Sequence, residues 1–239
     1  MAIEPIAIGL KVGVDILQKV APAGLGWIAT KFFGVSILAV GERRAGKSSF
    51  VNYFEHGFLL PPNTPTPRTL EVRNTASFNV AIGREKSLRM RVSKVTDTRG
   101  HDSIKEQVSL IVRRKPNVLM IFLDVSRDWD VVDEDYGIIY LKGLLDELNV
   151  RTLRVKGVSA KMQHLCIVLN KKDHVDDKEY KKKNEKLNIL LQQFSAPNWG
   201  PGQREISVFP CIAVENDNAV KHLDEMIKSI ITTVMLKVQ

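Results

Sequence analysis

Nine consecutive residues have the types and spacing of a phosphate-binding loop. The segment Gly41–Ser49 reads GERRAGKSS, which fits the pattern G-x-x-x-x-G-K-S. It follows the apolar run Val35–Val40 and leads into Ser49–Phe54, so a strand is predicted before the loop and a helix after it. Glycines allow backbone N–H groups to close around phosphate oxygens, and the start of a helix adds a favourable dipole. The residues predicted to contact a nucleotide are Gly41, Arg44, Ala45, Gly46, Lys47, Ser48 and Ser49.

Two of these side chains have distinct expected roles. Lys47 is expected to reach the β- and γ-phosphates, and the Ser48 hydroxyl is expected to bind Mg²⁺. The chain is therefore predicted to bind a nucleoside triphosphate together with a divalent cation.

A second motif, Asp97-Thr98-Arg99-Gly100, closes a predicted strand. Asp97 can bind Mg²⁺ through a water molecule, and Gly100 can offer its backbone N–H to the γ-phosphate. The pattern D-x-x-G alone is uninformative, because about one copy per chain arises by chance. Its position directly after a strand is what makes it a candidate.

A third motif, Asn170-Lys171-Lys172-Asp173, follows another apolar strand and indicates which base is bound. The Asp173 carboxylate can accept two hydrogen bonds from guanine N1–H and N2–H₂, a pair that adenine cannot supply. Asn170 can hold the loop and reach the base edge, while the stem of Lys171 packs over the ring. The alternative is a solvated basic strand exit, which the order of the three motifs disfavours. The predicted ligand is GTP or GDP.

The composition is that of a globular protein. The chain has 239 residues, of which 44% are hydrophobic and 26% charged, and its net charge is +8. This charge is compatible with anionic membranes, but no nucleic acid partner is expected. Cys166 and Cys211 lie in apolar runs and are predicted to be buried free thiols in a reducing compartment. With no signal-like start and no apolar run of about 18 residues, a cytoplasmic location is expected.

Strands and helices are predicted to alternate along the chain. The predicted strands are 35–40, 70–82, 87–96, 117–124, 164–169 and 205–214, and the predicted helices are 48–57, 135–148, 176–194 and 220–234. The second and third strands are expected to form an antiparallel hairpin. The order predicts an α/β fold, a mostly parallel sheet with helices on both faces and its ligand at the carboxyl edge of the strands.

The first 33 residues precede the nucleotide strand and are predicted to form a separate amphipathic helical segment. Ile6, Leu10, Val14, Leu17 and Ala21 recur at helical spacing. This helix either packs on the domain or lies on a membrane or a partner. The domain boundaries are therefore predicted as 1–33 and 34–239.

Taken together, the three motifs resemble those of the Ras-like and translation-factor class of P-loop GTPases, from about Val35 to Gln239. The resemblance implies a Ras-like G domain with a six-stranded sheet that contains one antiparallel strand. It also implies a switch threonine before the hairpin, with Thr66 and Thr69 as the candidates and Thr64 a weaker one. The segments Ala45–Ser49 and Thr66–Arg68 look like those of dynamin-type GTPases, which favours Thr66 as a ligand of nucleotide and metal.

The same resemblance points to a further base contact and to two candidates for hydrolysis. The S-A-K motif of the family has only a degraded match around Ala213, whose backbone N–H could still reach guanine O6. His101 follows Gly100 at the position where the family orients the attacking water. Arg44 occupies the loop position at which guanylate-binding proteins and atlastins carry an arginine that acts when two nucleotide domains meet. The alternatives are a surface histidine and a solvated loop arginine.

The leading hypothesis is a GTP-binding switch with slow, Mg²⁺-dependent hydrolysis, activated by nucleotide-dependent homodimerisation. Its two states would differ in the ordering of Phe58–Thr69 and Gly100–Glu106. The alternatives are a non-catalytic, nucleotide-bound interaction module and a dynamin-type membrane-associated GTPase. An unidentified effector protein and peripheral contact with an anionic membrane are the other expected partners. The basic runs Arg113–Lys115 and Lys181–Lys183 are predicted to be solvated helix faces.

Overall fold

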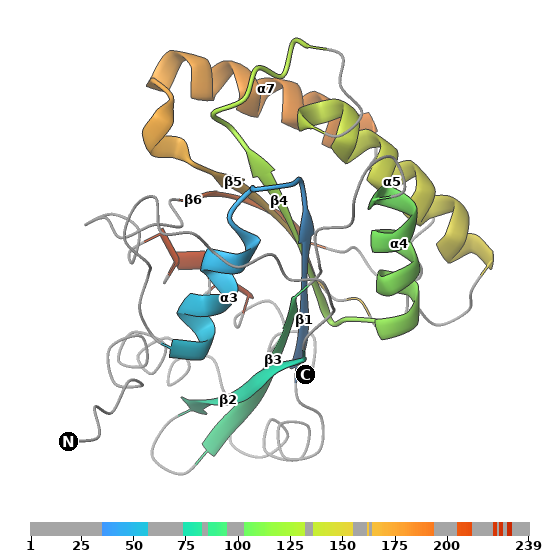
Figure 1. Ribbon diagram of the computed structural model, residues 1–239, viewed down its shortest axis with the longest axis vertical. Coiled ribbons are helices and arrows are strands. Elements are labelled where there is room, and N and C mark those ends of the chain that lie inside the picture. The colour runs from blue at the N-terminus through green and yellow to red at the C-terminus, as the bar shows by residue number, and fades with distance from the viewer. Residues whose placement is uncertain are drawn as a thin grey trace.

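A parallel sheet lies at the centre of the molecule. In the computed structural model, four strands whose side chains are described pair in parallel in the order β1 (Val35–Gly41), β4 (Val118–Asp124), β5 (His164–Asn170) and β6 (Glu205–Cys211) (Figure 1). Their register places Gly41 beside Phe122 and Asp124 beside Asn170. Since Cys211 also lies beside Asn170, all four strands end at one edge of the sheet. The prediction of an α/β fold with a parallel sheet is confirmed.

The structure describes residues 35–56, 74–82, 86–94, 103–131, 136–154, 162, 164–193, 205–211, 222–223, 225–226 and 229–230. The predicted N-terminal segment, residues 1–33, lies outside these ranges. No helix within them is long and apolar enough to cross a membrane.

The backbone pairing of the sheet continues on the other side of β1. There β3 (Lys86–Lys94) runs parallel to β1, and β2 (Asn74–Ile82) pairs antiparallel with β3. The strand order is β2-β3-β1-β4-β5-β6. Since Ala39 pairs with Lys94, the chain leaves β3 close to the edge at which β1 ends.

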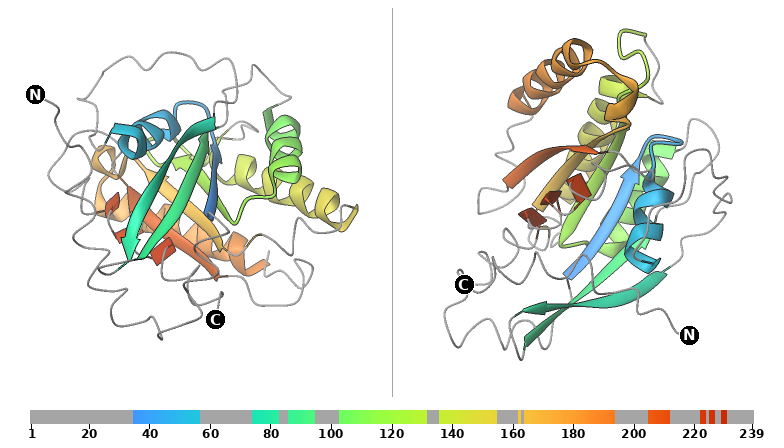
Figure 2. Two further views of the ribbon diagram at one scale, coloured as in Figure 1. Left: turned by 90° about the horizontal axis from the view of Figure 1, so that it is seen from below. Right: turned by 90° about the vertical axis from the view of Figure 1, so that its left-hand side faces the viewer.

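The apolar strands bury both of their faces, because helices cover each side of the sheet (Figures 1 and 2). On one side α4 (Ser103–Arg114), α5 (Gly137–Arg154) and α7 (Asp177–Gln193) pack against alternate strand residues such as Leu119, Ile121 and Leu123. On the other side Phe50 of α3 (Lys47–His56) packs on Phe122, with ring centroids 5.1 Å apart. Full burial of one such side chain stabilises the fold by about 1.5–3 kcal/mol.

Two helix predictions need correction. The helix predicted to end at residue 148 continues to Arg154, because the following residues include no glycine or proline and Arg151 pairs with Glu147 one turn earlier, at 2.8 Å. Lys183 was assigned to a solvated face but is only 4% exposed. Its ammonium group binds the carbonyl oxygens of Val125 and Arg127, which are contributed by the loop after β4.

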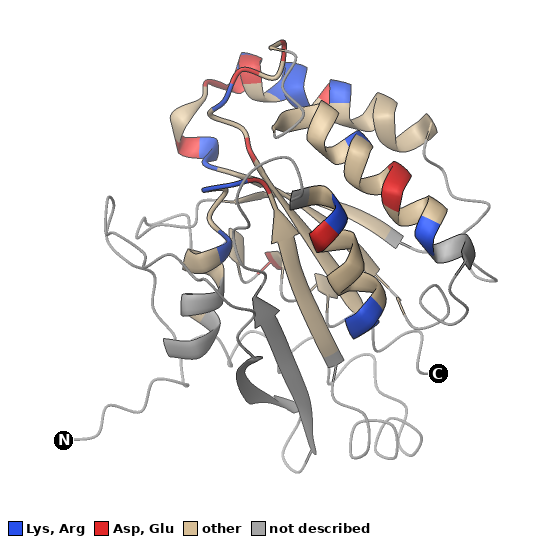
Figure 3. Ribbon diagram, turned by 45° about the vertical axis from the view of Figure 1, so that its right-hand side comes forward, with Lys and Arg blue, Asp and Glu red and all other residues tan. Residues whose placement is uncertain are grey.

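Charged residues lie mainly on the helices and on the loops that follow the strands, whereas the central strands carry few (Figure 3). Arg113 and Arg114 are exposed at the end of α4, as predicted. Cys166 and Cys211 are buried free thiols, also as predicted, and burial raises the pKa of the Cys166 thiol. Of the predicted closing helix, the described residues 222–223, 225–226 and 229–230 are helical, with Leu223, Met226 and Ile230 buried.

Candidate nucleotide-binding site

The phosphate loop turns sharply between β1 and α3. Gly41, Arg44 and Gly46 have positive φ angles of 142°, 61° and 88°. A Cβ atom on Gly41 would lie 2.3 Å from the Phe122 carbonyl oxygen, so only glycine fits where the loop passes β4. Arg44 adopts the left-handed conformation without being glycine, at a cost of about 1–2 kcal/mol. The loop therefore has the tight backbone that a phosphate cradle requires.

Lys47 is the first residue of α3 and is buried under the loop, with 6% exposure. Its ammonium group donates to the carbonyl oxygens of Gly41, at 2.8 Å, and Glu42. These contacts hold the positive charge of Lys47 against the first two residues of the loop. Ser48 and Ser49 follow in the first turn of α3 with half-buried side chains. The predicted phosphate-binding side chains are thus brought together at one helix start.

Arg43 and Arg44, in contrast, are exposed. Their side chains lie at the surface of the loop, whereas Glu42, Ala45 and Lys47 are buried. The predicted action of Arg44 on phosphates across a dimer interface remains a prediction.

The base motif lies beside this loop. Asn170 ends β5 and is 2% exposed, and its side-chain amide donates to the Ala45 carbonyl oxygen at 2.9 Å. Lys171 follows in the left-handed region, with φ 64° and ψ 38°. Asp173 lies in the short 3-10 helix η2 (Lys172–His174), and its carboxylate is partly exposed, with Oδ2 3.4 Å from Nε2 of His174. The structure therefore joins the base motif to the phosphate loop, as the sequence motifs predict for a GTP site.

Glu42 was not predicted as a functional residue. Its carboxylate is 1% exposed and accepts the backbone N–H groups of Asp124, at 3.0 Å, and Gly137. Burial raises the pKa of Glu42 to about 7; the two backbone hydrogen bonds and the charge of Arg127 oppose the rise, and the charge of Asp124 adds to it. Glu42 thus links the phosphate loop to the end of β4 and to the start of α5.

Gln107 of α4 makes a second connection. Its side-chain oxygen accepts the Gly41 N–H at 3.1 Å and the Tyr140 hydroxyl at 2.7 Å, and its amide nitrogen lies 3.5 Å from the Gly41 carbonyl oxygen. Gln107 itself is 6% exposed. The first glycine of the loop is therefore tied to α4 and, through Gln107, to α5. No sequence motif marks this residue, because it lies 66 positions from its partner.

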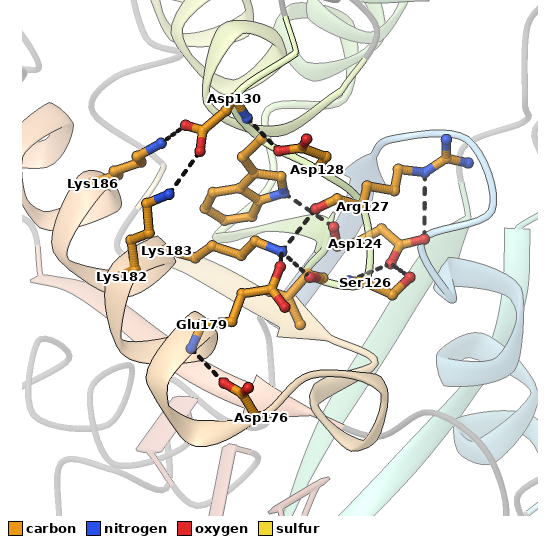
Figure 4. A network of polar contacts seen from close by, with 12 residues as sticks. Asp124, Ser126, Arg127, Asp128, Asp130, Asp176, Glu179, Lys182, Lys183 and Lys186 are labelled. Carbon is orange, nitrogen blue, oxygen red and sulfur yellow. Dashed lines mark hydrogen bonds and ion pairs between the residues drawn. The ribbon is translucent and has the colours of Figure 1, made fainter.

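Asp124 lies at the end of β4, between the two loops (Figure 4). It is 1% exposed, and its carboxylate meets Lys171, Ser126 and Arg127. Its backbone carbonyl accepts the indole N–H of Trp129 at 3.1 Å. The sequence shows Asp124 only as the last residue of an apolar run, which gives no signal of these partners.

Several predicted site residues lie outside the described residues. These are Thr64, Thr66, Thr69, Asp97, Gly100, His101 and Ala213. Their roles remain predictions.

The described residues suit Mg²⁺ only in part. They include no group of three or more His, Cys, Asp or Glu side chains that could hold a metal ion. The Ser48 hydroxyl is a hard oxygen ligand at the phosphate loop, and Mg²⁺ is commonly held by one or two protein oxygens together with phosphate oxygens and water. The site therefore fits Mg²⁺ that is bound jointly with a nucleotide.

Comparison with known proteins shows which solved structures have a similar fold. No protein-family model and no curated protein matches the chain. A crystal structure of the bacterial selenocysteine-specific elongation factor EF-Sec is similar, with TM-score 0.54, 16% identity, and coverage of 84% of this chain and 28% of that one. Translation elongation factor SelB from Methanococcus maripaludis, in complex with the GTP analogue GppNHp, is also similar, with TM-score 0.51, 14% identity, and coverage of 86% and 34%.

The chain thus spans about a third or less of the length of these elongation factors. Neither is a dynamin-type protein, so the dynamin-like part of the resemblance has no support here. At these identities the likeness concerns the fold, and it agrees with the site geometry. The described part of the chain has a P-loop GTPase-type fold.

Proposed function

We propose that this protein binds GTP and GDP with Mg²⁺, hydrolyses GTP slowly and acts as a nucleotide-controlled switch. The observation that carries the proposal is the hydrogen bond from Asn170 to the Ala45 carbonyl oxygen. It joins the loop that carries the proposed guanine-binding residues to the loop that carries the proposed phosphate-binding residues. A nucleotide bound across both loops would be recognised at both ends.

The described residues divide the binding between them. The backbone N–H groups at the start of α3 and the Lys47 ammonium group would hold the phosphates, and Ser48 would hold Mg²⁺. Asp173 would accept the two guanine donors, and the stem of Lys171 would cover the ring. Bound Mg²⁺ supplies charge neutralisation at the phosphates.

The remaining assignments belong to the same proposal. The sheet would be the complete six-stranded sheet of a Ras-like G domain, with β2 as its antiparallel edge strand, which the backbone pairing supports. The domain would span 34–239 and carry the helical segment 1–33. Asp97 and Gly100 fall between the end of β3 and the start of α4, where they would reach the phosphates. Thr66 would be the switch ligand and Ala213 the contact to guanine O6.

Switching would act through α4. The segment Gly100–Glu106 runs into this helix, and Gln107 of the same helix holds Gly41 of the phosphate loop. A change of order at the γ-phosphate would therefore reach α4 and α5, where an effector protein could read it. His101 would orient the attacking water. Arg44, exposed on the loop, would act on the phosphates when two copies meet over GTP.

The proposed location is cytoplasmic, with peripheral contact to an anionic membrane as an added feature of the basic chain. The two buried free thiols are compatible with a reducing compartment. The net charge of +8 and the predicted amphipathic segment 1–33 support the membrane contact.

Phosphate release at several protein concentrations tests the proposed reaction. Single-turnover release from GTP with excess protein should be slow, and its rate per molecule should rise with concentration. Arg44→Ala should flatten that rise and leave GTP affinity within about threefold of wild type, because phosphate binding depends on the backbone and Lys47. Arg43→Ala, at the neighbouring exposed arginine, is the matched control.

The possible results separate the parts of this proposal. A rate of phosphate release per molecule that does not depend on protein concentration would show that Arg44 and dimerisation have no role in hydrolysis. His101 would then be the remaining candidate, and His101→Ala would test it. Binding of GTP without any release would identify the protein as a non-catalytic, nucleotide-bound interaction module.

A further inference from the structure

A buried carboxylate holds the lysine of the base motif. Asp124 at the end of β4 is 1% exposed, and its Oδ2 atom forms an ion pair with the Lys171 ammonium group, which comes from a residue 47 positions later. The Lys171 side chain is about one-third exposed, so its stem lies at the surface while its charged end reaches inward. The lysine is thus tethered at the end farthest from its backbone.

The backbone of Lys171 is fixed as well. Its left-handed conformation is rare for a residue with a side chain, and such conformations persist where the surroundings determine them. Asn170 donates to Ala45 on one side, and the His174 N–H donates to the Lys171 carbonyl oxygen at 3.0 Å on the other. With both ends of the side chain fixed, the direction of its stem is determined.

Asp124 is itself held rigidly. Its Oδ1 atom accepts the Ser126 N–H at 3.0 Å and the Ser126 hydroxyl at 2.5 Å. The Nε atom of Arg127 lies 3.5 Å from Oδ2, and its guanidinium group stacks on the Tyr136 ring at 3.8 Å. The carboxylate therefore has a fixed orientation towards Lys171.

The loop after Asp124 is anchored to α7, the helix that follows the base motif (Figure 4). The buried Lys183 ammonium group donates to the carbonyl oxygens of Val125, at 2.6 Å, and Arg127, at 2.8 Å. The Val125 N–H donates to the Asn170 carbonyl oxygen at 3.0 Å. The loop 124–131 and the base motif therefore form one connected unit.

We propose that Asp124 is a positioning residue for guanine recognition, which fixes the stem of Lys171 as the surface on which the base stacks. The inference rests on the proposed function, because it names a residue that acts within the same nucleotide site. A base held flat on a fixed stem keeps its edge in register with Asp173. A loose stem lets the base shift, and the two hydrogen bonds to Asp173 are then weakened.

This role of Asp124 affects binding of the base and not binding of the phosphates. The phosphate loop is held by Lys47, Glu42 and Gln107, and none of these contacts passes through the Asp124 carboxylate. Loss of the tether should therefore reduce affinity for guanine nucleotides more than affinity for adenine nucleotides, which depends on the phosphates.

Calorimetric titration with GDP and with ADP tests the proposal. Asp124→Asn keeps the size of the side chain and an acceptor for Ser126 but removes the charge that binds Lys171. GDP affinity should fall by about 10- to 100-fold, as expected for the loss of a charge-assisted contact, while ADP affinity stays within about threefold. Asp130→Asn makes the same chemical change in the same loop, at a half-exposed carboxylate that in the described structure pairs with Lys182 and Lys186 of α7, and it should change neither affinity.

A second pair of variants avoids changing a buried residue. Lys171→Met keeps an apolar stem and removes the tether, whereas Lys171→Arg keeps a cation that can reach Asp124. Loss of the preference for GDP in the methionine variant and its retention in the arginine variant would support the proposal, even if Asp124→Asn does not fold.

Three results would overturn it. The first is an equal fall in GDP and ADP affinity for Asp124→Asn, which would show a structural role only. The second is an unchanged preference for GDP in Lys171→Met. The third is a wild-type protein that binds ADP as tightly as GDP; this would refute the proposed guanine site before any variant is measured, so the two failures are distinguishable.

Discussion

The phosphate loop follows β1 and the loop that carries the base motif (here the base loop) follows β5; β4 separates these two strands, and the two loops are held by different chemistry. Glu42, within the phosphate loop, accepts two backbone N–H groups, and burial raises its pKa to about 7. Asp124, beside the base loop, is equally buried but meets the cations Lys171 and Arg127. One carboxylate is therefore held mainly by backbone N–H groups, and the other by cationic side chains.

Under the proposed function, one edge of the sheet would bind both ends of the nucleotide. Phosphate is the same in every nucleotide, and a cradle of backbone groups and hydrogen bonds is sufficient to hold it. A base must be selected, which requires side chains in a fixed direction. Substitutions of the side chains that hold the phosphate loop should therefore alter affinity for all nucleotides or alter stability. Substitutions of the side chains that hold the base loop should alter the preference for guanine over adenine.

The largest effect is expected for Lys47→Ala. Among the described residues, Lys47 has the one ammonium group that binds the carbonyl oxygens of Gly41 and Glu42, and in the proposed site its charge would face the phosphates. Affinity for GTP and for ATP should both fall by at least about a hundredfold. Titration of both nucleotides measures this, with exposed Lys178→Ala as the control. Unchanged affinity would mean that the loop is not the binding site.

The pH dependence of stability is the next largest effect. The ordinary pKa of Glu42 is 4.5 and its folded value about 7, so the fold favours the protonated form. The stabilisation from this group is fully present below pH 4.5 and is lost as pH rises through 7. The difference corresponds to about 3 kcal/mol.

Urea unfolding between pH 4.5 and 8 measures this loss. In Glu42→Gln the contribution of the residue cannot titrate, and the decline in the free energy of unfolding across this range should be shallower by about the same amount. Parallel curves for wild type and variant would show that Glu42 keeps an ordinary pKa.

A smaller effect is expected at Gln107. Gln107→Leu removes the acceptor for the Gly41 N–H and the Tyr140 hydroxyl inside the protein. The free energy of unfolding should fall by about 2 kcal/mol. Gln107→Glu, which keeps an acceptor, should lose less, and exposed Gln193→Leu should lose almost nothing. Equal losses for the leucine and glutamate variants would argue against the hydrogen bonds as the cause.

Local patterns in the sequence predicted much of this arrangement. The apolar runs 117–124 and 164–169 became strands buried on both faces, and the glycines and Lys47 marked the turn into α3. Local patterns could not predict the contacts that distinguish the two loops. Glu42 meets a partner 82 positions away and Lys183 meets one 58 positions away, so their roles exist only once the sheet has formed. Lys183 was misassigned for this reason, since a lysine in a charged helix normally faces water.

The central claim is that the edge beside Asp173 selects guanine. Titration of wild type and Asp173→Asn with GTP, ATP and xanthosine triphosphate tests it most directly. Wild type should prefer GTP to both others, and the variant should prefer xanthosine triphosphate, because its amide presents a donor where guanine needs an acceptor. A bidentate contact of this kind is worth about 1–3 kcal/mol, which corresponds to a change in preference of about 5- to 150-fold. Equal affinity of wild type for GTP and ATP would contradict the account.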